Sequence, residues 1–302
     1  MDNTRNHTGK RRKRRHRSTA FILFVTLIIA VICVMAVFIG VYFSGIRYIK
    51  ADAGDGRVIK FFGKVNDLGS PLAGKLYFSS GGTAEIDNEA GTVTYSNGDV
   101  YEGELNNLLK HGKGKITYAS GDIYEGSFEY DEITGSGIFT FASGDVYEGE
   151  LIKSQKEGFG TYTWIDGSIY IGNFENDMKN GTGKYTWADG SSYEGEYVNE
   201  TKHGTGIYIF ANGDVYEGEF NNDIRTGKGV YNWANGEIYE GEFLNNKMNG
   251  WGIYKWPAGR TYEGYFENGK ILRVETEDGI NNDETEETVT EPQQTTGPVI
   301  DE

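Results

Sequence analysis

Residues 216–238 read YEGEFNNDIRTGKGVYNWANGEI, and this pattern recurs every 23 residues with no insertion or deletion. The tyrosine that opens it returns in a single column, at Tyr101, Tyr124, Tyr147, Tyr170, Tyr193, Tyr216, Tyr239 and Tyr262. A fixed period of this length is typical of an array in which one small supersecondary unit stacks on the next. The repeat therefore decides the fold of residues 101–272.

The alternation inside each unit predicts two short strands, 216–220 and 227–233 in the unit quoted above. Because successive side chains of a strand point to opposite faces, most aromatic residues and the glycines share one face, and the glutamates and lysines share the other. Asn235-Gly236 is typical of type I′ hairpin turns, since both residue types tolerate positive φ. We expect an all-β, single-layer array of stacked hairpins that bury a common aromatic face, with rings folded over the glycines.

The motifs Tyr-Glu-Gly-Glu-Phe, Gly-x-Gly-x-Tyr-x-Trp and Asn-Gly at this spacing resemble the MORN repeat (membrane occupation and recognition nexus) over residues 101–272. Ile171 replaces a glutamate, Ser127 and Asn173 replace the second glutamate, and Ser136 stands where the family usually has lysine. These departures fall on the outward face, so they leave the expected fold unchanged. The resemblance implies an elongated, twisted β-structure used for scaffolding, membrane association or protein contacts.

A basic arm precedes a long apolar run at the N-terminus. Residues 1–19 carry eight lysines and arginines against Asp2, and residues 20–43 carry no charge. As a helix, this run would be about 36 Å long, which is enough to cross a hydrocarbon core of about 30 Å. We expect a single-pass signal anchor in the plasma or cell membrane. Fewer positive charges follow the run than precede it, so the N-terminus is predicted to be cytoplasmic and the repeats extracytoplasmic.

A cleaved signal peptide is the alternative, since Ala51-Asp52-Ala53 has the small-x-small form of a cleavage site. The apolar run exceeds the roughly 7 to 15 residues of such peptides, which favours an uncleaved anchor.

Three other segments flank the repeats. Residues 44–56 are predicted to be a stalk. Residues 57–100 are predicted to be degenerate capping repeats, because Gly91 and Tyr95 stand 23 residues before their counterparts and terminal units of arrays are atypical. Residues 273–302 are acidic and poor in apolar residues, which predicts a disordered tail.

Charge and motifs limit the chemistry. The net charge is −16 although the N-terminal arm is basic, so the remainder is acidic and unsuited to nucleic acid. The only cysteine, Cys33, lies in the apolar run, so no intrachain disulfide is expected. His111 and His203 stand four units apart and cannot share a metal ion. The glycines alternate along strands instead of opening a helix, which excludes a dinucleotide-binding motif. We predict no catalytic residue, no cofactor and no metal ligand.

Two sets of outward residues are candidate contacts. An acidic ladder comprises Glu102, Glu125, Glu148, Glu194, Glu217, Glu240 and Glu263. Lysines on the neighbouring strand could pair with it, and a divalent cation or a cationic partner is the alternative. Phe159, Trp251 and Tyr265 are exposed aromatic residues that could touch a partner.

Together these features predict a membrane-anchored, non-enzymatic scaffold with a protein partner. A carbohydrate- or cell-wall-binding module is one alternative, and it would require exposed aromatic pairs in each repeat. A phospholipid-binding MORN protein is another, and it would require the inverted topology.

Overall fold

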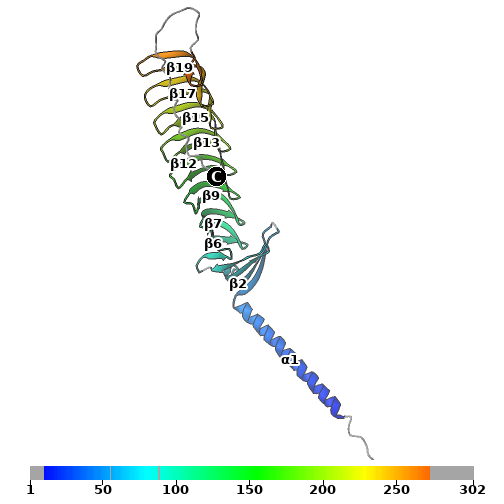
Figure 1. Cartoon of the computed structure of the whole chain (residues 1–302). Helices are drawn as coiled ribbons and strands as arrows, with labels where there is room; N and C mark the ends of the chain where they lie inside the picture. Colours follow the sequence, from blue (N-terminus) through cyan, green and yellow to red (C-terminus); the bar gives the residue numbers. More distant parts are fainter. Residues whose placement is uncertain (1–9, 55, 88, 273–302) are drawn as a thin grey trace, which may run out of the picture. The chain divides into compact units, whose positions relative to one another are not determined.

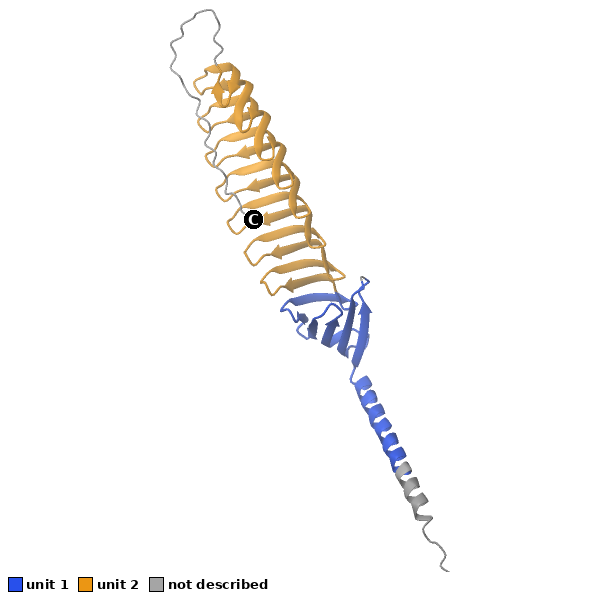
Figure 2. Ribbon diagram, turned by 45° about the vertical axis from the view of Figure 1, so that its right-hand side comes forward, with its two compact units in different colours: residues 1–109 blue, residues 110–302 orange. Residues whose placement is uncertain are grey.

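The computed structural model describes residues 10–54, 56–87 and 89–272, which form one helix followed by antiparallel strands. The chain divides into two compact units, residues 1–109 and 110–302 (Figure 2). The predicted all-β hairpin array with one N-terminal helix is confirmed. Residues 1–9 of the basic arm and the acidic tail at 273–302 lie outside the described residues.

Helix α1 spans Lys10–Phe43, so it begins within the basic arm, ahead of the predicted apolar span. Its part from Phe21 to Phe43 has a mean hydropathy of 3.3 and is long and apolar enough to cross a membrane. None of the side chains of this part is buried in the fold. Gly45, with φ of 76°, follows the helix in the left-handed conformation that commonly ends helices.

Unit 1 continues with six strands: β1 (Ile46–Asp52), β2 (Val58–Val65), β3 (Pro71–Phe78), β4 (Thr83–Asp87), β5 (Thr92–Tyr95) and β6 (Val100–Asn106). The prediction of a stalk at 44–56 is wrong, because β1 pairs along its whole length with β2. Within β1, Ile49 and Ala51 are half-buried and alternate with exposed Tyr48 and Lys50. This period of two is the pattern of a strand rather than of a stalk.

Residues 57–100 contain features of a faded repeat. The buried Phe61 ring lies over a glycine pair, since a Cβ at Gly63 would fall 2.7 Å from that ring and 2.5 Å from Gly74 Cα. The Tyr95 amide donates to Asp99 O at 2.8 Å, and Gly98 N donates to Tyr95 O at 2.9 Å. The turns of the regular repeats have the same two bonds. A capping role for these strands stays a prediction.

Unit 2 alternates nine-residue and seven-residue strands and ends in a short one. Figure 1 shows these strands stacked along the array in chain order. In chain order they are β7 (Leu109–Thr117), β8 (Ile123–Glu129), β9 (Glu132–Thr140), β10 (Val146–Ile152), β11 (Gln155–Thr163), β12 (Ile169–Glu175), β13 (Met178–Thr186), β14 (Ser192–Val198), β15 (Thr201–Ile209), β16 (Val215–Asn221), β17 (Ile224–Asn232), β18 (Ile238–Leu244), β19 (Lys247–Lys255), β20 (Thr261–Glu267) and β21 (Lys270–Ile271). Each pairs antiparallel with its neighbour in sequence, as in β16 with β15 and β17.

The type I′ turn lies within each repeat, and not between repeats at Asn235-Gly236 as the sequence predicts. Asn222 and Asp223 both have positive φ, 49° and 66°, so the type I′ turn lies here and strand β17 begins earlier than expected. Between repeats, only Gly236 is left-handed, and it donates its N–H to Trp233 O at 2.9 Å. Asn235 instead accepts the amide of Glu237 through its side chain at 3.0 Å. That local bond gives the asparagine a turn role that needs no positive φ.

The inner face of the array, defined by its opening tyrosines, is packed as predicted. Tyr216 is 0% exposed, and its hydroxyl donates to Glu219 O at 3.1 Å. Its ring covers two paired glycines: a Cβ at Gly229 would lie 2.7 Å from the ring, and a Cβ at Gly218 would lie 2.7 Å from Gly229 Cα. Phe220 packs edge-on against Tyr216 at 5.2 Å between ring centroids. The aromatic face is therefore closed by tyrosine over glycine.

A second line of rings runs along the array without a break. Tyr231 and Trp233 lie 4.5 Å apart, and Trp233 reaches Tyr254 of the following repeat at 5.3 Å. The line comprises Phe139, Phe141, Tyr162, Trp164, Tyr185, Trp187, Tyr208, Phe210, Tyr231, Trp233, Tyr254 and Trp256. Its tryptophans are half-buried, so this column is more exposed than the sequence predicts. Ring contacts thus join each repeat to the next.

Candidate functional site

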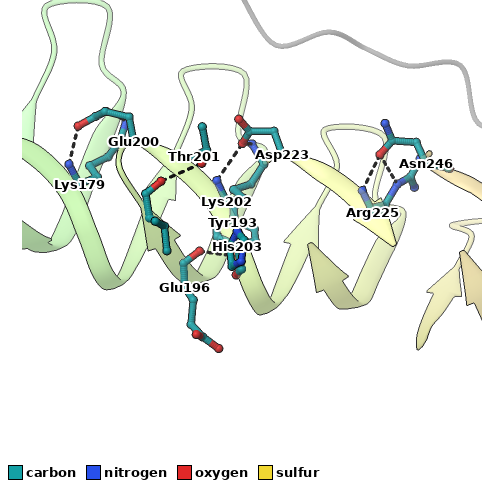
Figure 3. A network of polar contacts seen from close by, with 11 residues as sticks. Lys179, Tyr193, Glu196, Glu200, Thr201, Lys202, His203, Asp223, Arg225 and Asn246 are labelled. Carbon is teal, nitrogen blue, oxygen red and sulfur yellow. Dashed lines mark hydrogen bonds and ion pairs between the residues drawn. The ribbon is translucent and has the colours of Figure 1, made fainter. Parts of the chain in front are cut away.

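One edge of unit 2 is fixed by charged side chains that reach from one repeat to the next turn. Lys202 Nζ lies 2.7 Å from Asp223 Oδ1, and the Lys202 amide donates to the same carboxylate at 3.0 Å (Figure 3). In return, the Asp223 amide donates to Lys202 O at 3.0 Å. Lys179 pairs with Glu200 in the same way, at 2.8 Å. These bonds hold the type I′ turns in register.

The same cations lie over the inner aromatic rings. Lys179 Nζ is 5.2 Å from the centroid of the Tyr185 ring and 5.8 Å from that of Trp164. Arg225 takes the equivalent place, 5.3 Å from Tyr231. A cation over an aromatic face is attracted by the ring, so this column stabilises the fold. The role of these cations was not predicted from the sequence. The available signal was a basic residue that recurs two positions before the Gly-x-Gly motif in several repeats.

At the opposite edge, acids that follow the inter-repeat glycine hold two of the turns. Asp214, 5% exposed, accepts the amide of Ala234 and the hydroxyl of Tyr231, both at 2.8 Å. Asp145 accepts Ile165 N at 2.8 Å and Tyr162 OH at 3.1 Å. Burial and then the Asp214 contact raise the pKa of Tyr231 above its usual value. Asp145 and Asp214 thus fasten their turns to the next repeat and are not free to bind a ligand.

The acidic ladder lies on the outer face, defined as the face of Glu217, opposite the tyrosines. Glu194 pairs with Lys184 at 3.2 Å, and Glu240 pairs with Lys255 at 3.8 Å. Both pairs are exposed, so each contributes no more than about 1 kcal/mol. The predicted pairing across strands is confirmed at these two positions.

A second set of glutamates has a different role from the ladder. Glu219 Oε1 accepts the amide of Lys228 at 2.9 Å, where the register shifts by a β-bulge. Gly227 at this bulge has φ of 57°, and a Cβ there would strike the Glu219 carboxylate. Glu196 accepts Thr205 N at 3.2 Å in the same manner. These acids cap bulges, a role that the outward position alone did not reveal.

The three predicted aromatic contacts are all exposed but fall into two groups. Trp251 and Tyr265 are 45% and 52% exposed and form a cross-strand pair with ring centroids 5.0 Å apart. Phe159, 60% exposed, stands opposite Asn173 in another part of the array. The structure therefore brings two of the three residues together.

Among residues 10–54, 56–87 and 89–272, no group of three or more His, Cys, Asp and Glu side chains is placed to hold a metal ion.

Seven consecutive repeats match the model of the MORN repeat, at residues 101–123, 124–146, 147–169, 170–192, 193–215, 216–238 and 239–259. The chain belongs to the MORN repeat family. No curated protein matches it significantly.

Two solved structures resemble parts of the MORN chain with low TM-scores. One is the TCP10 domain of Danio rerio CPAP with a STIL peptide, at 12% identity and a TM-score of 0.38, covering 73% of this chain and 100% of that one. Another is the SAS-4 TCP domain of Drosophila melanogaster with a proline-rich motif of Ana2, at 15% identity and a TM-score of 0.34, covering 51% and 84%. Scores this low carry no argument about function.

The MORN repeats of this chain vary mainly on the outer face. All seven matched units keep the tyrosine and both inner glycines. The outer position between the two Gly-x-Gly glycines changes freely; in order along the chain it is Lys113, Ser136, Phe159, Thr182, Thr205, Lys228 and Trp251. The inner face is thus uniform, while the outer face differs from repeat to repeat.

Proposed function

We propose that this protein is a membrane-anchored, non-enzymatic scaffold whose MORN repeats lie outside the cytoplasm and bind a protein partner. One observation carries the proposal: the outer face combines exposed apolar side chains with carboxylates along successive repeats, while the inner face is filled by its own rings. A folded sheet that leaves such a face uncovered offers a surface for association.

The anchor is supported by α1 and by the strand that follows it. Cleavage after Ala53 would remove β1, which pairs with β2 from Ile46↔Lys64 to Asp52↔Val58. Keeping β1 in the fold favours an uncleaved anchor over a signal peptide. The excess of lysine and arginine before the apolar run supports a cytoplasmic N-terminus.

A protein partner is favoured over sugar or lipid by the side chains of the outer face. A carbohydrate module that stacks sugars on each repeat needs exposed aromatic pairs throughout, but Trp251 and Tyr265 stand where other repeats have Thr205 and Glu219. The ladder of carboxylates on this face repels anionic lipid headgroups.

The topology is tested with an epitope tag after Glu302 in intact cells. We expect an impermeant antibody to bind this tag without permeabilisation. The matched control carries the same tag at Met1 of the full-length chain, where we expect binding only after permeabilisation. The opposite pattern would place the repeats in the cytoplasm and overturn the extracytoplasmic scaffold.

A further inference from the structure

A trough runs along the outer face of unit 2. Two hollows of about 500 Å³ and 940 Å³ lie on this face, and both are lined by Thr205 and Ile207. The first extends back to Phe159 on β11, and the second extends forward to Trp251 on β19. The two hollows therefore form one trough, which contains two of the exposed aromatic residues.

The floor of the trough alternates acidic and aliphatic side chains. The register of the strands places one member of the row directly opposite the next, from β14 to β20. The row is Glu194, Ile207, Glu217, Val230, Glu240, Ile253 and Glu263, and all but Glu263 line the trough. Because side chains in directly opposed positions are neighbours, the row presents carboxylates separated by aliphatic side chains.

The trough has an excess of negative charge. Five glutamates line it, Glu194, Glu196, Glu217, Glu240 and Glu242, against Lys184 and Lys228. Lys184 pairs with Glu194, and Lys255 pairs with Glu240, through exposed contacts. Glu217, between Ile207 and Val230, makes no hydrogen bond or ion pair with any residue that the structure describes. Such a surface attracts a cationic ligand that also has apolar groups. The acidic tail 273–302 and the same face of a second copy are both disfavoured, because they carry the same sign of charge.

The spacing of the row selects the conformation of the ligand. Neighbouring strands lie about 4.8 Å apart, so equivalent glutamates recur about every 9.6 Å. A β-strand laid along the row would present side chains on one face about every 6.7 Å, which does not match. A polyproline II helix has three residues per turn and rises about 9.3 Å per turn, so every third side chain would meet the next glutamate.

We propose that the trough binds an extended polypeptide in the polyproline II conformation, with lysine or arginine at every third residue and apolar residues between. The basic side chains pair with the row glutamates, and the apolar ones contact Ile207, Val230 and Ile253. This inference names a partner for the scaffold role proposed above and rests on that role.

The test is fluorescence anisotropy on the full-length protein in phosphatidylcholine nanodiscs. The probe is a labelled peptide of four Lys-Leu-Pro repeats, and its control is Lys-Lys-Leu-Leu-Pro-Pro twice, which has the same composition but another spacing. We expect the first peptide to bind at least about fivefold more tightly than the second. Its affinity should fall as the salt concentration rises, since exposed ion pairs are screened. Equal binding of the two peptides would overturn the proposal.

Matched variants locate the site. Replacing Glu217 and Glu240 together by glutamine should lower the affinity for the Lys-Leu-Pro peptide about tenfold, since each exposed ion pair contributes about threefold. Glu125→Gln with Glu148→Gln changes the same column outside the trough and should leave affinity unchanged. Equal loss in both double variants would reduce the effect to general attraction, and no loss in the first would exclude this trough. Either result leaves the proposed topology standing, because the tag experiment tests it separately.

Discussion

The two faces of the repeat array in unit 2 differ in what they tolerate. On the inner face, Tyr216 fills the space above Gly218 and Gly229 so fully that neither glycine has room for a Cβ. On the outer face, the neighbouring Glu217 lies exposed between two aliphatic residues. The comparison shows that one face of a single sheet can maintain the fold while the other remains free to vary, and the predictions below test that separation.

The largest expected effect comes from alkaline pH, which acts on the inner faces of several repeats at once. Burial raises the pKa of Tyr185 to about 12 and raises that of Tyr193 and Tyr239 further. An unfolded tyrosine loses its proton near pH 10, so between that pH and the folded pKa the unfolded state binds fewer protons. Stability is therefore fully present below about pH 10 and falls as pH rises above it.

We expect far-UV circular dichroism to show cooperative loss of the strands above pH 10, together with tyrosinate absorbance. Ionisation of most tyrosines near pH 10 with the strands intact would contradict a closed inner face.

The next largest effect is expected for Tyr216→Ala. Removing a fully buried ring creates a cavity and should lower the free energy of unfolding by about 3 to 5 kcal/mol. Tyr216→Phe keeps the ring, loses the bond to Glu219 O and should cost about 1 kcal/mol. Guanidinium unfolding of the full chain in detergent measures both, and equal losses would mean that the hydroxyl bond, not the packing, holds the repeat.

A smaller effect is expected for Gly229→Ala, at about 1 to 3 kcal/mol, because the new methyl would overlap the fixed Tyr216 ring. Gly190→Ala is the control for backbone conformation alone, since Gly190 has φ of 86° and open space around it. Its cost should be about 1 kcal/mol. If thermal unfolding shows that Gly190→Ala loses more stability than Gly229→Ala, lack of space under the Tyr216 ring is not the reason for glycine at position 229.

The inner face could be predicted from sequence because it depends on local periodicity. The tyrosine column and the glycines beneath it follow from side-chain alternation within one repeat. The Lys184–Glu194 pair joins two consecutive repeats, and the same alternation places both side chains on the outer face. The turn types could not be predicted. The Asn235 side chain accepts a local hydrogen bond, so Asn235-Gly236 does not form a type I′ turn. The type I′ turn is formed by Asn222-Asp223, which lacks the glycine expected of this turn type.

The edge contacts were also missed, because they join residues about 20 positions apart. Lys202 with Asp223 and Asp214 with Ala234 become neighbours only when the stacking register is known. The same holds for the trough: alternation of Glu217 with Ile207 and Val230 runs across strands rather than along the chain. A pattern perpendicular to the strands is invisible until the strands are paired.

The most direct test of the separation of the two faces measures stability and binding on one variant. For Glu217→Gln with Glu240→Gln, we predict that guanidinium unfolding changes by less than about 0.5 kcal/mol per site, as for surface substitutions, while affinity for the Lys-Leu-Pro peptide falls about tenfold. A loss of stability as large as that of Gly229→Ala would contradict the account, since the outer carboxylates would then be holding the fold.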